Sequence, residues 1–579
     1  MKVFAEDAWS GPSKIILGVD IGTTQSAVAF AYLRPGRPQS LRRVGEWPGQ
    51  VAQETKFPTL VYYDSDNKPA SFGASALKRG VEQKAEEEHW KLARHFKLHL
   101  HPQAMKDKHN LRTQPLPDGV SLLTIYTDFM VYLMKHTKNY FESRTIDGQE
   151  VWEELHKDMT IVLTHPNGWG VKEQNFLRQA AIAANYVPSS KAISHIRFVS
   201  EAEASVHFCV FDGDLHNRLK PNTTFIVCDA GGSTIDTTAY CIKTASPLLE
   251  LEEKKASACV QAGGVSVDDE FEQYLSQILN RIDIDNDDQG DYIRTAVKDF
   301  ESVAKREFDD VGGRYGVELG LGKKFVHKEF GINKGAISLE GDKVESFFEK
   351  SVTQTIESVR QQMSELDCKH ILVVGGFGES LYLRKGLTDA FGNNGCTVNV
   401  ANDSTAKAAA DGAVIWWGKL SVVSRATRMP FGVDVQVPYD AREPSHAGRS
   451  VYRGVDGLDY VSGKWSQIVG RDVVMNTDDA KRGSYWRAYK TPNPSLANFK
   501  DAMFAYTADG TPNVWLYDPQ GNLNGGFEQI CEIETDLSGM RQALKRKTGP
   551  DGEYYCLDYI IALQFGGTEI QAFLEWEQD

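Results

Sequence analysis

The sequence predicts an α/β protein with two similar lobes in residues 1–420 and a β-rich domain in residues 421–579. Two observations predict this class. A strand–turn–strand pattern occurs in residues 15–32 and again in residues 225–242, and helical periodicity gives way to short alternating segments near residue 420. With 579 residues, of which 41% are hydrophobic and 25% charged, the chain is long enough for several domains with their own cores.

Both copies of the repeated pattern have the same order of residue types. An apolar run ends at an Asp, a Gly follows two residues on, hydroxyl side chains come next, and a second apolar segment leads away, which predicts a β-hairpin. A third apolar run, 371–374, ends in another glycine-rich turn. The turn residues are Asp20, Gly22, Thr23, Thr24 and Gln25 in the first copy, Asp229, Gly231, Gly232, Ser233, Thr234 and Asp236 in the second, and Gly375, Gly376 and Phe377 in the third.

Turns of this kind can bind a phosphate chain. Glycines allow the backbone to approach closely, and successive N–H groups aimed into one concavity bind anions. An Asp beside each turn would repel phosphate unless a cation lay between them. Asp20 and Asp229 facing each other across a cleft would therefore hold Mg²⁺ through its waters, because Mg²⁺ dehydrates reluctantly. The alternative is three unrelated glycine-rich turns, which does not account for their common order.

Charge and composition narrow the partners. The chain has 64 Lys and Arg against 79 Asp and Glu, a formal net charge of −15, whereas a dedicated nucleic-acid binder needs clustered positive charge. The short basic cluster at residues 545–547 is interpreted as a solvated face among turn residues. No apolar stretch approaches the ~18 residues of a membrane-spanning helix, and the acidic start at residues 1–7 argues against a secretion signal. We expect neither a nucleic-acid nor a membrane partner.

The cysteines predict a reducing compartment. No two of them have CxxC spacing and several lie within apolar runs, where a free Cys behaves as a small hydrophobe. We therefore expect reduced, mostly buried thiols rather than a zinc site or disulfides, and a cytoplasmic protein. The eight cysteines are Cys209, Cys228, Cys241, Cys259, Cys368, Cys396, Cys531 and Cys556.

At the glycine-rich turns the sequence resembles the superfamily of actin, the sugar kinases and the 70-kDa heat-shock proteins. Residues 20–26 are similar to its first phosphate loop, residues 229–236 to its second, and residues 375–377 to its adenosine loop. The resemblance implies a two-lobed actin-like ATPase domain built from duplicated ribonuclease-H-like lobes, lobe I over about 14–220 and lobe II over about 221–420. It also implies ATP or ADP and Mg²⁺ as ligands.

Further segments are similar to the heat-shock branch, namely residues 199–205, 262–271, 305–306 and 408–413. The similarity is strongest to its divergent heat shock 70 kDa protein 12 branch, on residues 96–100, 116–119, 431–435 and 565–570. Two departures from the family pattern stand out. Phe377 replaces a serine of the adenosine loop, which is expected to alter base stacking, and Ala406 replaces an acidic residue.

The resemblance implies a role for each matching residue. Lys97 would offset charge at the γ-phosphate, with Lys91 as the alternative lysine, while Glu201 and Asp236 would help to place the attacking water. Each of these residues also has a structural interpretation without a role in catalysis or binding. Asp20 and Asp229 would form turns, Glu201 would be a charge at a helix N-terminus, Asp236 would be an exposed strand residue, and residues 305–306 would lie on a solvated helix face. The implied catalytic residues are Asp20, Lys97, Glu201, Asp229 and Asp236, with Asp20 and Asp229 also on Mg²⁺, and the implied nucleotide-binding residues are Gly22, Thr23, Thr24, Gln25, Gly231, Gly232, Ser233, Thr234, Gly263, Gly264, Lys305, Arg306, Gly375, Gly376 and Phe377.

The C-terminal domain takes the place of the family's substrate-binding β-domain, without its helical lid. Residues 555–565 and 570–576 alternate apolar and other side chains around a Gly566–Gly567 turn, which predicts a hairpin, and a short helix is expected over 536–545. A protein or peptide client is a possible partner of this domain.

The leading functional prediction is a Mg²⁺-dependent ATPase of the chaperone type, in which nucleotide closes the two lobes. Two alternatives stay open. One is a nucleotide-gated interaction protein with little turnover. The other is a small-molecule kinase of the same superfamily, which would need a general base for a substrate hydroxyl.

Overall fold

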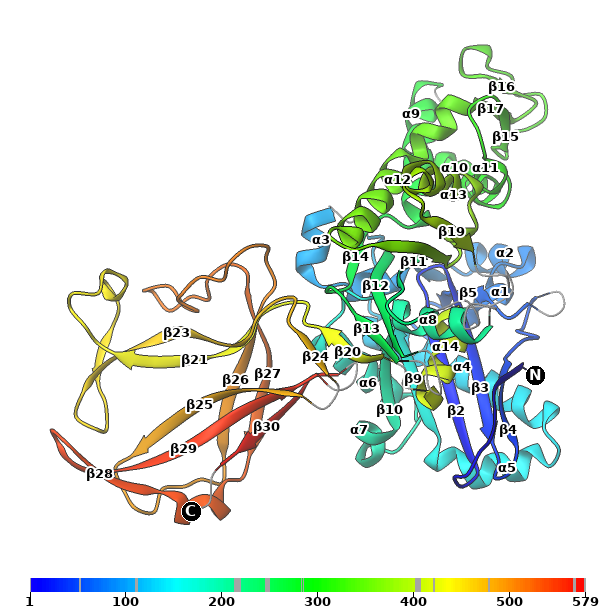
Figure 1. The fold of residues 1–579 in the computed structure, drawn as a ribbon. Coiled ribbons are helices and arrows are strands. Elements are labelled where there is room, and N and C mark those ends of the chain that lie inside the picture. The colour runs from blue at the N-terminus through cyan, green and yellow to red at the C-terminus, as the bar shows by residue number, and fades with distance from the viewer. Residues whose placement is uncertain are drawn as a thin grey trace. The chain divides into compact units, whose positions relative to one another are not determined.

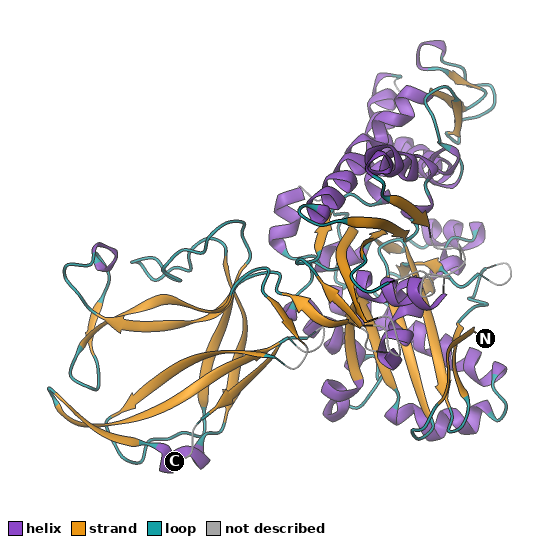
Figure 2. Cartoon of the chain, in the orientation of Figure 1, coloured by secondary structure: helices purple, strands orange, loops and turns teal. Residues whose placement is uncertain are grey.

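The computed structural model describes residues 2–50, 54–109, 113–212, 220–244, 250–282, 284, 286–400, 408–419, 422–476, 479–565 and 569–576. The chain divides into two compact units (Figure 1). The first comprises Met1–Trp169, Glu173–Leu251 and Ser257–Ser421, and mixes helices with sheets (Figure 2). The second comprises Val422–Asp579 with the short pieces Gly170–Lys172 and Glu252–Ala256, and consists mainly of strands.

The first main sheet of the first unit is built around an N-terminal hairpin. β2 (Lys14–Ile21) pairs antiparallel with β3 (Gln25–Leu33), from Lys14 opposite Leu33 to Ile21 opposite Ser26. The apolar run of β2 is buried from residue 15 onward, as expected of a strand covered on both faces. The hairpin predicted from residues 15–32 is confirmed. The sheet order is β1-β4-β3-β2-β9-β10, with β5 on β3, and its other strands are β1 (Lys2–Ala8), β4 (Pro38–Arg43), β5 (Phe57–Pro58), β9 (Thr160–His165) and β10 (Ile196–Ser200).

The second main sheet repeats this arrangement. β11 (Thr224–Ala230) pairs antiparallel with β12 (Ile235–Thr244), which places Asp229 opposite Asp236, so the second predicted hairpin is also confirmed. β18 (Cys368–Val374) runs parallel to β11 and brings Val374 beside Asp229. The second and third glycine turns therefore lie at the same edge of this sheet. Further strands are β13 (Glu250–Glu253), β14 (Ala258–Val260) on β12, and β19 (Thr397–Val400) parallel to β18.

Residues 45–160 form an elaborate insertion between β4 and β9. Its main helix, α4 (Leu122–Arg144), begins where the Ser121 hydroxyl accepts a hydrogen bond from the Thr124 N–H at 3.1 Å. Ile125, Phe129 and Leu133 are buried along one face, as the helical spacing predicts. The other elements are β6 (Leu60–Tyr63), β7 (Pro69–Phe72), α1 (Gly73–Ala76), α2 (Arg79–Glu87), β8 (Lys91–Arg94), the 3₁₀ helix η1 (Phe96–Leu100), α3 (Gln103–His109) and α5 (Gly148–Leu155).

The first unit also contains helices and a small sheet outside the insertion. The periodicities around residues 176–184 and 348–359 correctly predict α6 (Val171–Ala183) and α12 (Gly341–Met363), whose Ala180, Phe348 and Val359 are buried. A small three-stranded sheet, β15-β17-β16, lies between α11 and α12 in sequence. The other elements are α7 (Ala192–His195), α9 (Gly264–Arg281), α10 (Asn286–Ser302), α11 (Ala304–Glu307), β15 (Arg314–Glu318), β16 (Ile332–Asn333), β17 (Ala336–Glu340) and α13 (Leu381–Phe391).

Small residues allow two helices of the first unit to pack closely. α8 (Glu201–Asp212) lies against α14 (Ala408–Lys419), which begins with the family-like segment 408–413. A Cβ atom added at Gly412 would lie 1.8 Å from the carbonyl oxygen of Ala204, a distance that no side chain can occupy. Gly412 therefore fixes the separation of α8 and α14, and α8 in turn carries Glu201.

This close approach gives a testable expectation for stability. Gly412→Ala should lower the free energy of unfolding of the first unit by at least about 2 kcal/mol, because the two backbones must separate to admit the methyl group. Gly80→Ala in α2 is the control, since its added methyl group meets no atom within 4 Å. It should raise stability slightly, because alanine has the better helix propensity. Thermal and urea unfolding would measure both, and an unchanged midpoint for Gly412→Ala would contradict the expectation.

The second unit contains two sheets that share one core. One sheet has the order β22-β23-β21-β26-β27 and the other has the order β25-β29-β28 with β30 on β29. Buried residues from both, such as Val433, Met503 and Ile561, belong to the same hydrophobic cluster. The strands of these sheets are β21 (Phe431–Pro438), β22 (Val451–Arg453), β23 (Asp459–Val469), β25 (Ala480–Tyr489), β26 (Phe499–Tyr506), β27 (Phe527–Thr535), β28 (Lys545–Gly549), β29 (Gly552–Gln564) and β30 (Gln571–Glu575). Two further strands, β20 (Val422–Ala426) and β24 (Val474–Asn476), pair antiparallel with each other.

Some predictions for this unit need correction. The pairing of β29 with β30 confirms the last hairpin, although its turn at residues 566–567 lies outside the described residues, as does Ala406. Residues 545–547 are exposed but lie on strand β28 rather than in a turn, because β28 pairs along one side of β29. The expected helix over 536–545 is a short 3₁₀ helix, Ser538–Ala543.

Two further structural facts bear on the sequence predictions. All eight cysteines are free thiols, five of them buried. Within the described ranges, no helix combines the length and apolarity needed to cross a bilayer.

Candidate active site

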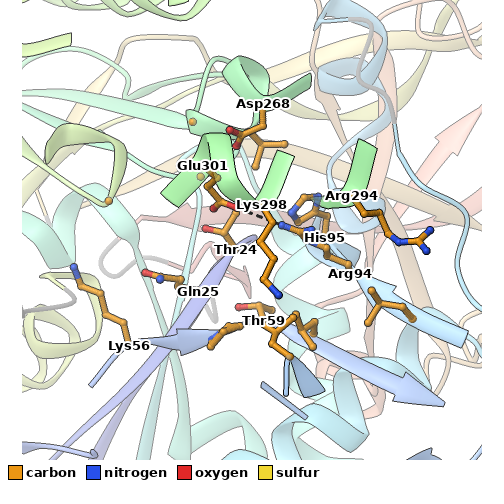
Figure 3. A pocket seen from close by; sticks show the side chains of 18 of the residues that line it. Thr24, Gln25, Lys56, Thr59, Arg94, His95, Asp268, Arg294, Lys298 and Glu301 are labelled. Atoms are coloured by element: carbon orange, nitrogen blue, oxygen red, sulfur yellow. Dashed lines mark ion pairs between the residues drawn. The ribbon is translucent and has the colours of Figure 1, made fainter. Parts of the chain in front are cut away.

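Two adjoining cavities lie among the three glycine turns of the first unit. The smaller, of about 30 Å³, is lined by both turn aspartates, Asp20 and Asp229. The larger, a cleft of about 1570 Å³ (Figure 3), shares part of the first two turns with it. Of the expected residues, the small cavity is lined by Asp20, Gly22, Thr23, Thr24, Gln25, Lys97, Glu201, Asp229, Gly231, Gly232, Ser233, Thr234 and Gly375, and the cleft by Thr24, Gln25, Gly231, Gly232, Gly264, Lys305, Arg306, Gly376 and Phe377.

The two turn aspartates are buried and each is oriented by a hydroxyl group. The Thr164 hydroxyl donates to Asp20 Oδ1 at 2.9 Å, and the Ser205 hydroxyl donates to Asp229 Oδ2 at 2.7 Å. Asp20 is 1% exposed and Asp229 is 7% exposed. Two ordered carboxylates therefore lie at one small cavity, each at the end of a central hairpin strand.

Asp236 lies behind this cavity rather than in its lining. The N–H of Asn167 donates to its Oδ1 at 2.7 Å, and the Cys259 side chain also interacts with this carboxyl group. Burial, followed by the charge of Glu201, raises the pKa of Asp236 to about 7. A carboxyl group with this pKa can accept or donate a proton near neutral pH.

Lys97 and Glu201 form a buried ion pair at the small cavity. The Lys97 Nζ lies 2.6 Å from Glu201 Oε1, with side-chain exposures of 4% and 12%. The Trp169 ring lies 5.5 Å from the same ammonium group. Lys97 reaches this position from η1, and Glu201 is the first residue of α8. Lys91, the alternative lysine, donates to the Asp118 carbonyl oxygen at 3.2 Å at an exposed position.

The turns approach each other so closely that glycine is required. A Cβ atom at Gly232 would lie 2.7 Å from the Thr24 hydroxyl oxygen of the first turn. Gly375 has a φ of +86°, and a Cβ atom there would lie 2.4 Å from Asp229 Oδ1. The Gly231 N–H is used within its own turn, donating to the Thr234 carbonyl oxygen at 2.9 Å. Gly263 lies behind the second turn, where its N–H donates to the Ser233 carbonyl oxygen at 2.9 Å.

The expected adenosine residues lie along the larger cleft. The Lys305 Nζ donates to the Gly264 carbonyl oxygen and to Asp268 Oδ2, both at 2.7 Å. Burial raises the pKa of Asp268 to about 7 although Lys305 opposes this shift. Arg306 is exposed. A Cβ atom at Gly376 would meet no atom within 4 Å, so there is open space beside the third turn.

Phe377 lines the cleft but is largely buried. The residue is 6% exposed, and its ring stacks on Phe348 at a centroid distance of 6.2 Å. Its effect on base stacking stays a prediction.

Sequence reasoning missed the side chains that orient the carboxylates. Thr164 and Asn167 lie at the end of β9, which runs parallel to β2 in the same sheet. Their position at this strand end is the sequence feature that could have identified them as neighbours of the first turn. Ser205 lies one helical turn after Glu201 on α8, a spacing that puts both on one face. Asp268 follows the Gly263–Gly264 turn by one helical turn.

The polar groups at the small cavity fit a magnesium nucleotide. In the described part of the chain, no three His, Cys, Asp or Glu side chains are grouped to ligate a metal directly. The groups at the small cavity are two carboxylates, hydroxyls, turn backbone and one ammonium. Such a set fits a hydrated cation carried by phosphate oxygens, with the carboxylates accepting hydrogen bonds from its waters. The cleft is also larger than the volume a small ligand needs.

Comparison with known proteins shows which of them are similar to this chain over most of its length. No protein-family model matches the chain. Mouse heat shock 70 kDa protein 12A is 21% identical over 637 residues, which cover 96% of this chain and 89% of that protein. Human heat shock 70 kDa protein 12A is 22% identical with the same coverage, and human heat shock 70 kDa protein 12B is 22% identical over 652 residues, covering 96% and 88%. The chain is a distant homologue of the heat shock 70 kDa protein 12 branch.

The homology extends over both units of the chain and nearly all of each relative, so it confirms the resemblance recognised at the glycine turns. Kinship with the heat shock 70 kDa protein 12 branch implies an actin-like ATPase fold, which agrees with the mixed α/β sheets of the first unit.

Proposed function

We propose that this chain is a magnesium-dependent protein of the 70-kDa heat-shock type that binds and hydrolyses ATP, with nucleotide controlling lobe closure. One observation carries the proposal: two ordered aspartates, two glycine turns and the Lys97–Glu201 ion pair meet at one small cavity. The homology to the heat shock 70 kDa protein 12 branch supports the same function.

The binding roles follow from the position of each group. Thr23, Thr24 and Gln25 would contact the β- and γ-phosphates from the first turn, and Gly232, Ser233 and Thr234 would contact them from the second, where Gly231 shapes the turn. Asp20 and Asp229 would accept hydrogen bonds from the waters of Mg²⁺, which neutralises phosphate charge when it is bound. Lys305, Arg306, Gly375 and Gly376 would hold the adenosine, supported by Gly264 and by Phe377 from the core.

The hydrolytic roles concern a water and a developing charge. Asp236, whose pKa of about 7 suits proton transfer, would accept the proton of the attacking water through an intervening water, because it lies behind the cavity. Lys97 would stabilise the charge that develops on the γ-phosphate, and Glu201 would hold Lys97 in place. Phosphoryl transfer asks for positioning and electrostatics rather than covalent chemistry, and these residues supply both.

The proposed organisation extends to the domains. Lobes I and II of the nucleotide domain would span about 14–220 and 221–420, and residues 421–579 would form a β-domain resembling a substrate-binding domain. A protein or peptide client would bind there under the control of the nucleotide. A cytoplasmic location stays a prediction from the cysteines.

The proposal is tested by ligand-dependent thermal stability. At ~100-fold excess over its Kd, MgATP should raise the unfolding free energy of the wild-type first unit by about 2.7 kcal/mol, which corresponds to a midpoint shift of several degrees. Asp229→Ala should abolish the shift. Asp389→Ala, at an exposed aspartate of α13, is the control and should keep it.

The outcomes are distinct. A wild-type protein with no shift in ATP or ADP with Mg²⁺ would refute nucleotide binding, and a shift retained in Asp229→Ala would refute this site. A single-turnover assay then separates hydrolysis from binding alone.

A further inference from the structure

His95 lies in the cleft between the insertion and lobe II, and none of the roles above uses it. It connects β8 to η1, two residues before Lys97, and has the left-handed backbone angles φ +54° and ψ +25°. Left-handed backbone is uncommon in residues other than glycine, although histidine tolerates it better than most. Figure 3 labels its imidazole among the side chains that line the cleft, close to that of its chain neighbour Arg94.

One nitrogen of the imidazole is available for a hydrogen bond. Its Nε2 is buried and has no partner among the residues that the structure describes. Burial, followed by the charges of Arg94 and Lys305, lowers the pKa of His95 to about 3. The ring is therefore neutral at physiological pH, with a nitrogen that can form one hydrogen bond as donor or acceptor.

Two ion pairs across the cleft link lobe II to the insertion, which carries His95. Arg94 lies 3.6 Å from Glu301 of α10, and Glu82 of α2 lies 3.5 Å from Lys298 of the same helix. These contacts hold the insertion next to lobe II. They set His95 within electrostatic reach of Lys305, which is itself fixed by Asp268.

We propose that His95 is a specificity-determining residue of the nucleotide site, whose Nε2 forms a hydrogen bond with a ribose hydroxyl group. The proposal rests on the proposed function. The phosphates would lie at the first two turns and the base near Arg306 and Gly376, so the sugar would lie between them, beside Lys305 and opposite His95. A neutral imidazole matches a hydroxyl group, which can donate or accept, whereas a phosphate contact would favour a charged ring.

The test measures ribose recognition directly. Isothermal titration of full-length protein would compare MgATP, the magnesium complex of 2′,3′-dideoxyATP, and magnesium tripolyphosphate. In the wild type the first should bind more tightly than the second. In His95→Asn this preference should fall about fivefold, the loss expected for one hydrogen bond, with tripolyphosphate affinity unchanged. His95→Gln should keep part of the preference, because its amide nitrogen reaches nearly as far as Nε2.

The control variant is closely matched. His89 lines the same cleft and has a φ of +55°, so His89→Asn makes the same substitution in the same backbone conformation. It should leave the preference for ribose unchanged. Asparagine also tolerates left-handed backbone, which keeps both variants foldable.

Each other outcome overturns the proposal. An undiminished preference in His95→Asn, or an equal loss in His89→Asn, removes His95 as the ribose contact. A parallel loss of tripolyphosphate affinity makes it a phosphate contact instead. If the wild type binds ATP, none of these results contradicts the proposed function. If the wild type binds no nucleotide, both the role of His95 and the proposed function are refuted.

Discussion

Lys97→Met is expected to lower the single-turnover rate of ATP hydrolysis by at least about 100-fold, because it removes the ammonium group next to the γ-phosphate position. ATP affinity should change less, since the turns and the adenosine residues remain. The variant should also be less stable by about 3 kcal/mol, because the carboxylate of Glu201 is left in a site where its side chain is 12% exposed. Single-turnover hydrolysis and thermal unfolding would measure the two effects.

Two further variants separate catalysis from folding. Lys97→Met/Glu201→Gln should recover most of the lost stability without recovering the rate, because the unpaired charge is gone but the ammonium is still missing. Lys91→Met should keep the wild-type rate, since Lys91 bonds a backbone carbonyl at an exposed position. If Lys91→Met lost hydrolysis and Lys97→Met kept it, the assignment of the catalytic lysine would be reversed.

The sequence was informative wherever the chemistry was local. An apolar run that ends at Asp20 or Asp229 and turns through glycine contains the whole hairpin within twenty residues, so the existence of both hairpins followed from the pattern. The same holds for α4, whose buried stripe repeats every turn after the Ser121 cap. Local periodicity and turn chemistry need no knowledge of the rest of the chain.

Contacts between distant segments could not be read in this way. Lys97 and Glu201 are 104 residues apart in sequence, and Thr164 and Asp20 are 144 apart. Lys97 came from the family resemblance, whereas Thr164 came only from the fold, because a hydroxyl at a strand end has many possible partners. Burial in the complete fold, which sets the pKa of Asp236 near 7 and that of His95 near 3, is likewise invisible to a sequence pattern.

One prediction was wrong about which residues form a turn. The basic residues 545–547 form strand β28, because the chain turns back directly after Gly549 and the next strand, β29, pairs with them. The turn therefore follows the basic cluster instead of containing it.

Asp236 predicts the pH dependence of hydrolysis. Its pKa of about 7 means that the carboxyl is protonated below that pH and cannot accept a proton from water. The single-turnover rate should therefore rise with pH up to about 7 and level off above it, with a tenfold fall for each pH unit on the acid side. Asp236→Asn should lower the plateau by about 10²-fold or more and remove the rising limb, because an amide is no base at any pH in this range.

Two variants test whether Asp236 is the group whose titration sets the pH dependence of hydrolysis. The Glu201 charge raises the pKa of Asp236 after burial, so Glu201→Gln should move the midpoint of the rate profile to lower pH. Asp268 also has a pKa of about 7 but lies in the adenosine part of the cleft. Asp268→Asn should therefore alter nucleotide affinity and leave the midpoint in place. A midpoint that moves in Asp268→Asn and stays fixed in Glu201→Gln would show that the titrating group lies at the adenosine end, and Asp236 would lose its role as the base.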